Sequence, residues 1–316
     1  MGTATERPGP RRTRPQTPHP MHPILFEIPG IGFPIRSFGL MVVLGFVVGS
    51  HFFTKLAGSF GDNPQQDPVT YARLPMWGLV GILLGARAFY VIVEIARAST
   101  VGQRYLSEPL SIFYYWEGGL VMYGGLFGGV GLGLLGARRL GLAIPPVADL
   151  GLVVAFIGQA VGRIGCLLVG DDYGSVVAGK WRELPFPITL RVPDLAWLRA
   201  HPESLFDHAL AGEVIWCTQL WMSANGLLLF LIGRWLLKRR RYRGQVALQL
   251  MVLYSITRSF IEAYRGDSVR GLWFDGALST SQLISLGAGA LALLVLIVLR
   301  LRGVTSDAQA NTDGTP

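Results

Sequence analysis

The feature that most constrains this chain is a series of long apolar blocks separated by polar connections. Each block is long enough to cross the hydrocarbon core of a bilayer, which is about 30 Å thick and needs a helix of about 20 residues. Charged residues make up 15% of the chain, well below the share of about a quarter in soluble domains. The sequence therefore predicts an all-α polytopic membrane protein with seven transmembrane helices. The blocks cover residues 36–56, 74–97, 119–137, 146–169, 214–237, 246–264 and 278–300.

Basic residues stand in short runs at the ends of the apolar blocks. Apart from the basic tail before Met21, which is an exception to the topology below, they occur in the connections 138–145 and 238–245 and in the residues after 299. Because lysine and arginine accumulate on the cytoplasmic side, we expect these regions and the carboxyl end to be cytoplasmic. The amino end is then outside, as are the connections 98–118, 170–213 and 265–277. Topology explains the net charge of +8, so we expect no nucleic-acid partner.

The chain is predicted to form one membrane domain, residues 21–302, between two polar tails. Residues 1–20 lack the hydrophobic core of a secretory signal, so we expect a disordered tail, or a start of translation at Met21. Residues 303–316 are polar and are expected to be disordered. The long connection 170–213 alternates apolar residues with prolines, which predicts a small extracytoplasmic cap.

The two cysteines, Cys166 and Cys217, lack the paired spacing of a metal-binding motif. We expect both to be free, buried thiols, although their separation in the fold decides whether a disulfide is feasible. The sequence calls for no metal and no cofactor.

Glycines are dense at the start of the third block. The pairs Gly118–Gly119 and Gly124–Gly125 flank Tyr123. Two adjacent pairs at the outer boundary predict a turn or a broken helix that lines a cavity. The later glycines, Gly128 and Gly129, are typical of close helix packing in lipid.

Ionisable residues inside the hydrocarbon are costly and therefore indicate functional positions. Four such residues stand out: Arg87, Arg163, Arg258 and Glu262. Because Tyr254, Arg258 and Glu262 repeat at every fourth position, and Arg265 follows, one helix presents a polar stripe.

The depth of these groups points to a lipid headgroup. Arg163 lies about 25 Å and Arg258 about 18 Å from the cytoplasmic start of their blocks, so both belong to the outer half of the bilayer. Arg36 and Tyr123 enter from the same side. A guanidinium stays charged when desolvated, and its fork of donors fits phosphate oxygens. These residues are therefore candidates for binding an outer-leaflet phospholipid.

Structural alternatives stay open for the same residues. Arg258 and Glu262 are spaced to neutralise each other as a buried pair. Arg163 has Asp171 and Asp172, beyond the next turn, as its nearby acids. A structural or lateral-access role suits Arg87 as well as a catalytic one.

The segment from Gly162 to Gly174, which contains Gly-Arg-Ile-Gly and an acidic pair, resembles the signature of the prolipoprotein diacylglyceryl transferases. Companion motifs agree in order and spacing from Met21 to Arg302. They are Ile35 to Leu40, Leu84 to Arg87, Trp116 to Gly125 and Tyr254 to Arg265. The resemblance implies seven transmembrane helices with an external amino end, in the bacterial cytoplasmic (inner) membrane.

The same resemblance implies a reaction. The diacylglyceryl group of phosphatidylglycerol moves to the lipobox cysteine of a preprolipoprotein, which leaves a thioether and glycerol 1-phosphate. The implied partners are phosphatidylglycerol, preprolipoprotein signal peptides and membrane lipid. Arg163 and Arg258 would hold the phosphate, and Glu262 would orient Arg258. Tyr254 and Gly174 would shape the pocket. The remaining candidates are Tyr123 for catalysis and Arg36, Arg87 and Asp171, with Gly174 and Tyr254, for lipid binding.

Several positions depart from the family pattern. Tyr123 stands where many members have histidine, so a histidine base cannot act unchanged. Cys166 replaces a frequent asparagine, and the segment Trp216–Met222 keeps only Thr-Gln-Leu of a longer motif. One alternative is therefore a catalytically silent relative that binds phospholipid or lipoprotein precursors. A small-solute transporter is less favoured, because the two halves show no inverted repeat.

Overall fold

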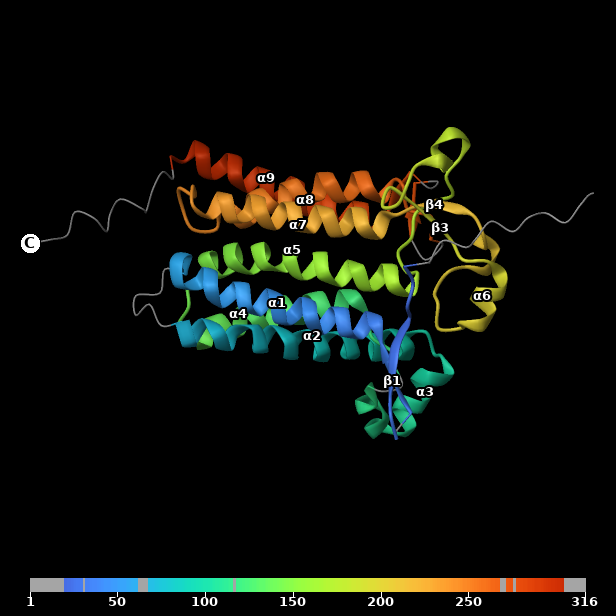
Figure 1. Cartoon of the computed structure of the whole chain (residues 1–316). Helices are drawn as coiled ribbons and strands as arrows, with labels where there is room; N and C mark the ends of the chain where they lie inside the picture. The colour runs from blue at the N-terminus through green and yellow to red at the C-terminus, as the bar shows by residue number, and fades with distance from the viewer. Residues whose placement is uncertain are drawn as a thin grey trace, which may run out of the picture.

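The computed structural model describes residues 20–30, 32–61, 68–115, 118–267, 271–274 and 277–303. The predicted tails, apart from Pro20 and Gly303, lie outside the described residues, as do Trp116 and Glu117 of one family motif. Figure 1 shows long helices lying side by side, with the smaller elements gathered at one end of the bundle.

Each predicted apolar block overlaps one long helix, with ends that differ by up to a few residues. The helices are α1 (Ser37–Phe60), α2 (Pro68–Ala96), α4 (Met122–Arg139), α5 (Ile144–Val169), α7 (Thr218–Leu237), α8 (Gln245–Glu262) and α9 (Thr280–Leu301). Five of them, α1, α2, α5, α7 and α9, are long and apolar enough to cross a membrane. Helices α4 and α8 have 18 residues each, and glycines or charged residues lower their mean hydropathy. The protein is therefore mostly helical and suited to a membrane.

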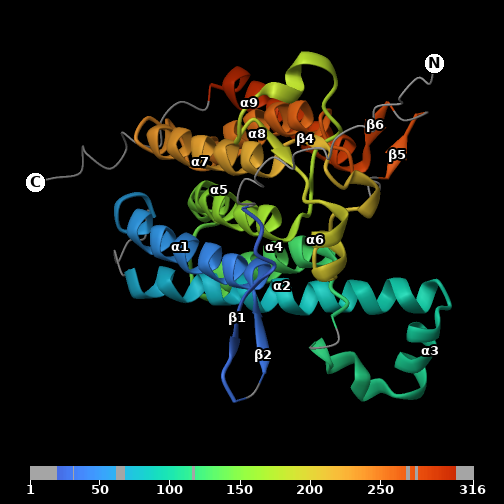
Figure 2. The ribbon, with the colours of Figure 1, turned by 45° about the vertical axis from the view of Figure 1, so that its right-hand side comes forward.

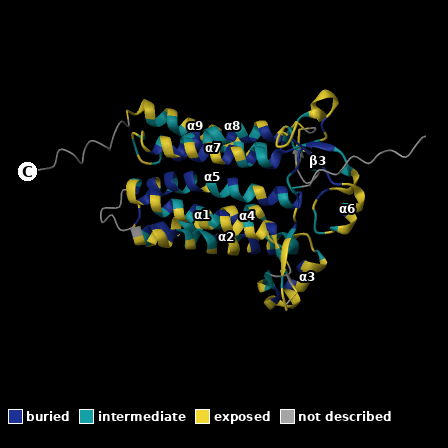
Figure 3. Cartoon of the chain, viewed as in Figure 1, coloured by how far each residue is buried: buried dark blue, intermediate teal, exposed yellow. Residues whose placement is uncertain are grey.

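The outward faces of the helices are apolar, as expected for contact with lipid. Figure 3 shows exposed positions along the outer sides of the bundle and buried positions along its interior. The exposed residues include large apolar side chains such as Leu84 on α2, Phe127 on α4 and Leu294 on α9. Contiguous apolar surface on this scale is unusual for a protein in water and marks a membrane-facing surface.

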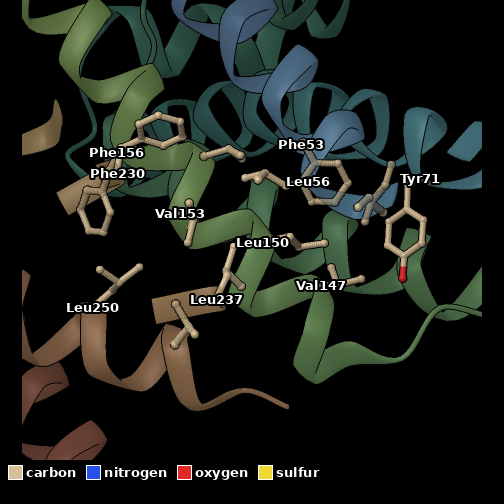
Figure 4. Packing of buried hydrophobic residues seen from close by; sticks show 14 of the residues in the cluster. Phe53, Leu56, Tyr71, Val147, Leu150, Val153, Phe156, Phe230, Leu237 and Leu250 are labelled. Atoms are coloured by element: carbon tan, nitrogen blue, oxygen red, sulfur yellow. The ribbon is translucent and has the colours of Figure 1, made fainter. Parts of the chain in front are cut away.

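Helix α5 is the centre of the bundle. Its Leu150 and Val153 are fully buried, and the surrounding cluster includes Phe53 of α1, Phe230 of α7 and Leu250 of α8. Figure 4 shows these side chains converging on α5 from the neighbouring helices. One end of α5 is thus fixed by packing, which positions the residues at its other end.

Glycines bring α2 and α4 into backbone contact. A β-carbon added at Gly85 would lie 2.8 Å from the α-carbon of Gly128, and one at Gly128 would lie 2.8 Å from the α-carbon of Gly85. Gly124 is helical and also packs against Gly85. The expected turn is confirmed at Gly118 and Gly119, which have φ values of 84° and 76°. The extension of that turn to the second pair was wrong, because close packing is what requires the small residue there.

The expectation of an all-α fold needs correction, since short antiparallel hairpins lie at one end of the bundle. They are β1 (Ile24–Ile28) with β2 (Phe33–Arg36), β3 (Thr189–Arg191) with β4 (Val214–Trp216), and β5 (Leu272–Trp273) with β6 (Leu278–Ser279). Short helices accompany them: α3 (Thr100–Ser107), η1 (Pro109–Phe113), η3 (Gly179–Glu183), α6 (Leu195–Ala200) and η4 (His208–Leu210). Figure 2 shows the β1–β2 hairpin and α3 as separate projections.

The long connection between α5 and α7 folds into a small unit with its own core. Leu190, Val192, Leu198 and Phe206 pack together there with Ile215. The connections from α4 to α5 and from α7 to α8, together with the C-terminal end of α9, lie at the opposite end of the bundle (Figure 1). The basic connections predicted to share one side therefore do share one end.

Candidate functional site

The site begins where α5 ends. Gly170 adopts a left-handed conformation with φ 77°, and the backbone N–H of Asp171 donates to the carbonyl of Cys166 at 2.9 Å. This termination is favoured by glycine, which has no β-carbon to clash. It turns the chain back over the end of the helix, so that Asp171 and Asp172 lie beside Arg163.

Asp172 is the centre of an ion-pair network. One carboxylate oxygen pairs with Nη1 of Arg163, and the other lies 2.5 Å from Nη2 of Arg265. The thiol of Cys166 lies 3.7 Å from the same carboxylate. Asp172 therefore joins the end of α5 to the segment that follows α8.

The polar stripe of α8 supplies the other half of the network. Nη1 of Arg258 lies 2.6 Å from a carboxylate oxygen of Glu262, and these side chains are only 8% and 2% exposed. Nη2 of Arg258 also donates to the hydroxyl of Ser281 on α9 at 3.3 Å. The buried Arg258–Glu262 pair that the spacing allowed is therefore present. Arg265 is bound more fully, since its Nε and Nη2 both donate to Asp267, at 2.8 and 2.5 Å.

The three arginines differ in how many donors are already used. A guanidinium has five N–H donors. Within the described part of the chain, Arg163 donates one hydrogen bond, to Asp172, and its side chain is 17% exposed. Arg265 is paired with three acids, Asp172, Asp267 and, at 3.8 Å, Glu262, so its donors are largely used within the protein. Arg163 is thus the arginine best able to donate hydrogen bonds to phosphate oxygens.

The electrostatics keep Asp172 ionised. Burial acts to raise the pKa of Asp172, but the charges of Arg163 and Arg265 outweigh burial and hold that pKa below its ordinary value. Burial, followed by the neighbouring charge of Asp172, raises the pKa of Asp171. Burial lowers the pKa of Arg265, but its bonds to Asp267 and the charge of Asp172 leave that pKa raised. The pKa values of the two adjacent aspartates are therefore shifted in opposite directions.

Residues at the start of α7 hold the turn at Asp171 and Asp172 in place. The hydroxyl of Thr218 donates to the carbonyl of Asp172 at 2.8 Å, and the amide of Gln219 donates to the carbonyl of Asp171 at 3.0 Å. Both donors are buried. The Thr-Gln that this chain keeps from the family motif is therefore what positions the turn, whereas the flanking changes leave these bonds in place.

Gly174 is required by close packing. Its N–H donates to the carbonyl of Trp216 at 3.1 Å, and an added β-carbon would lie 2.6 Å from the β-carbon of Trp216. Gly266 is equally tight, since its β-carbon would lie 2.5 Å from the α-carbon of Ser175. The segment after Asp172 thus lies between β4 and the end of α8 with no room for a side chain at either glycine.

Arg87 is occupied by backbone groups. It donates to carbonyls of Ser111, Ile112, Tyr114, Gly118 and Gly119 at distances from 2.6 to 3.3 Å. Its guanidinium also lies over tyrosine rings of the same region. These contacts favour the structural role for Arg87, because they tie the connection between α2 and α4 to α2.

Three further predicted residues, Tyr254, Arg36 and Tyr123, lie outside the ion pairs that the structure describes for the network. Tyr254 is one turn before Arg258, and its ring centroid is 5.3 Å from that of Phe156 on α5. Arg36 is exposed at the start of α1, and Tyr123 is half-buried at the start of α4. Among the described residues, neither makes an ion pair with the Asp172 network. Their predicted roles stay predictions.

Sequence reasoning named Asp172 only as a possible partner and left Arg265, Asp267, Thr218 and Gln219 out of the site. Arg265 had a signal, because it continues the α8 stripe. Thr218 and Gln219 had one in the Thr-Gln-Leu kept from the family motif, whereas Asp267 had none, since its role depends on a contact with Arg265 that the sequence does not reveal. Cys166 and Cys217 are free and buried, as expected.

Cys166, Asp171 and Asp172 offer a thiol and two carboxylates, which are ligand types that cations bind in proteins. Their ligand atoms lie within 4.8 Å of one another. Asp172 is already paired with two guanidiniums, whose charges oppose a cation there. The arrangement instead suits the binding of an anion by arginines.

Comparison with known proteins identifies the family. The sequence model of one family, described as prolipoprotein diacylglyceryl transferase, matches residues 23–298. The chain belongs to the prolipoprotein diacylglyceryl transferase family.

Similar proteins named phosphatidylglycerol–prolipoprotein diacylglyceryl transferase cover nearly the whole chain. The protein from Geobacter sulfurreducens is 29% identical over 92% of this chain and 99% of its own length. The one from Gloeobacter violaceus is 30% identical over 90% and 96%, and the one from Bacillus velezensis is 26% identical over 93% and 98%. The likeness therefore extends over nearly the full length of the chain.

Proposed function

We propose that this protein transfers the diacylglyceryl group of phosphatidylglycerol to the lipobox cysteine of prolipoproteins. The observation that carries the proposal is the buried arginine network around Asp172, in a chain that matches this family over residues 23–298. Arg163 supplies unused donors for the phosphate, and Arg258 supplies a second, nearly buried guanidinium. Such a pair suits a lipid phosphodiester better than a neutral solute.

In this reaction the substrate thiolate attacks the glycerol carbon that carries the phosphate ester. The new carbon–sulfur bond forms as the carbon–oxygen bond breaks, and the electron pair passes to the phosphate oxygen of the departing glycerol 1-phosphate. The thiol proton must leave before or during the attack, because the thiolate is the nucleophile. Arg163 and Arg258 stabilise the charge that develops on the leaving phosphate.

The supporting residues have separate tasks. Glu262 orients Arg258, and Asp172, itself fixed by the arginines, orients Arg163. Asp171 lies next to this pair, and Gly174 and Tyr254 shape the pocket. Tyr123 stands where many members have histidine, and it is not assigned the role of general base.

The membrane arrangement is part of the same proposal. All seven long helices cross the bacterial inner membrane, the small unit at 170–213 is extracytoplasmic, and the carboxyl end is cytoplasmic. The shared location of the basic connections at the end opposite the arginine network supports this orientation. The network then faces the outer leaflet, where lipid and the signal peptide of a precursor meet.

A reconstituted assay tests the function directly. Purified protein is supplied with phosphatidylglycerol and a lipobox peptide, and the products are followed as released glycerol phosphate and as a mass gain on the peptide. We expect both, in equal amounts. Retained lipid binding without either product would favour the catalytically silent relative instead.

A further inference from the structure

Two buried amide nitrogens inside the bundle lack an acceptor. Among the described residues, Nε2 of Gln159 on α5 and Nδ2 of Asn225 on α7 are buried and donate no hydrogen bond. Asn225 as a whole is 7% exposed. A buried donor without a partner is costly, and in a bilayer no bulk water is present to satisfy it. Such groups call for an explanation in terms of function.

Both amides lie at one level, about one helical turn inward from the arginines. Gln159 precedes Arg163 by four residues on α5, which is about 6 Å along the same face. The hydroxyl of Ser223 donates to the carbonyl of Ala160 at 2.6 Å, and a β-carbon at Gly226 would lie 2.8 Å from the carbonyl oxygen of Phe156. These contacts place residues 223–226 of α7, and so Asn225, beside residues 156–160 of α5.

The chemistry of a phospholipid matches this arrangement. Its phosphate is followed, one short step toward the bilayer centre, by the ester groups that join the acyl chains to glycerol. An ester carbonyl accepts hydrogen bonds and donates none, which complements an amide N–H. We propose that Gln159 and Asn225 form a subsite that binds the ester carbonyls of the diacylglyceryl group while Arg163 holds the phosphate. The subsite rests on the proposed function and specifies its substrate as an ester-linked lipid.

The test compares two lipids that differ only in these carbonyls. Phosphatidylglycerol with ester-linked chains and its dialkyl ether analogue with the same chain length carry the same phosphate and the same bond to be broken. We expect kcat/KM of the wild-type protein to be about tenfold or more higher for the diester lipid, because the ether leaves both amides unpaired. The loss should fall mainly on the KM for lipid, since the subsite is remote from the reacting carbon.

Gln159→Leu and Asn225→Leu remove the amides while keeping an apolar filling of similar size. In each variant the ratio of kcat/KM for the diester lipid to kcat/KM for the diether lipid should approach one. Neither variant should have a lower unfolding temperature, because the substitution also removes the unpaired donor. Ser223→Ala is the matched control. Its hydroxyl is already bound to the Ala160 carbonyl, so the wild-type ratio should persist.

The outcomes separate the two proposals. Absence of turnover with both lipids would overturn the proposed function itself. Equal turnover of both lipids by the wild-type protein would overturn the subsite while the function stands. A lower unfolding temperature in the leucine variants with an unchanged ratio would also overturn it, since that result shows that the amides stabilise helix packing alone.

Discussion

Replacing Arg163 by lysine separates the role of charge from the role of the guanidinium fork. The wild-type side chain uses one of its N–H groups on Asp172 and is partly exposed, so its other donors are free to meet a phosphate. Lysine keeps the positive charge and can keep the pairing with Asp172. It cannot present two parallel donors to two phosphate oxygens, because an ammonium acts as a point charge.

The size of the effect follows from the hydrogen bonds lost. A hydrogen bond to a charged group contributes about 1.5–3 kcal/mol. If Arg163→Lys loses one such bond to the phosphate in the transition state, kcat/KM should fall about 10- to 150-fold, at about 1.4 kcal/mol per factor of ten. Stability should change by less than about 1 kcal/mol, since the charge opposite Asp172 is retained.

The assay is the release of glycerol phosphate from phosphatidylglycerol in the presence of a lipobox peptide, together with thermal unfolding of the same samples. Arg240→Lys is the matched control, because Arg240 is another largely buried arginine with an acid partner. It lies 3.3 Å from Asp149 and donates to the carbonyl of Phe60 at 2.9 Å, at the far end of the bundle. This control should lose stability but keep kcat/KM. A twofold or smaller loss in Arg163→Lys would refute the assignment of phosphate binding to its fork.

Two further predictions concern the ion pairs of Asp172 and the packing of α2 against α4. Asp172 has a lowered pKa, so its contribution to stability is complete above the ordinary value near 4 and is lost as the pH falls through the lower folded value. The unfolding temperature of the wild-type protein should therefore fall more steeply below about pH 4 than that of Asp172→Asn, and parallel profiles would contradict the pairing. Gly128→Leu should destabilise the protein by about 3 kcal/mol or more, because its β-carbon meets the backbone of Gly85. Gly131→Leu, whose β-carbon has nothing within 4 Å, should remain near wild type in thermal unfolding, and equal losses in both variants would remove packing as the cause.

The sequence predicted the parts of the fold that depend on local composition. Apolar length located all the long helices, and the basic runs located the end of the bundle at which their connections lie. The left-handed turn at Gly118–Gly119 followed from an adjacent glycine pair. Gly124–Gly125 has the same local pattern but packs against α2, and no single sequence distinguishes a glycine needed for a turn from one needed for a neighbouring helix.

The site was predictable for residues on helices and less so for those on turns. Arg163, Arg258 and Glu262 were evident because charge inside an apolar block is conspicuous. Asp267 lies in polar surroundings where another polar residue carries no signal, and Gln219 lies at the start of a helix where its amide has no evident partner in the sequence. Their roles arise only when the segments after α5, before α7 and after α8 meet. Local pattern therefore finds the charged groups, and tertiary contact decides which of them are bound to one another.

The network resolves an apparent conflict between charge neutralisation and phosphate binding. An arginine with no partner in the membrane would be costly before lipid arrives, whereas an arginine saturated by acids would have nothing to offer a phosphate. Asp172 avoids both extremes, because it shares its two oxygens between Arg163 and Arg265. Arg265 receives a second acid, Asp267, and is fixed, which holds Asp172 in place. Arg163 is thereby kept ionised and oriented while most of its donors stay available, which is the state that a headgroup-binding arginine requires.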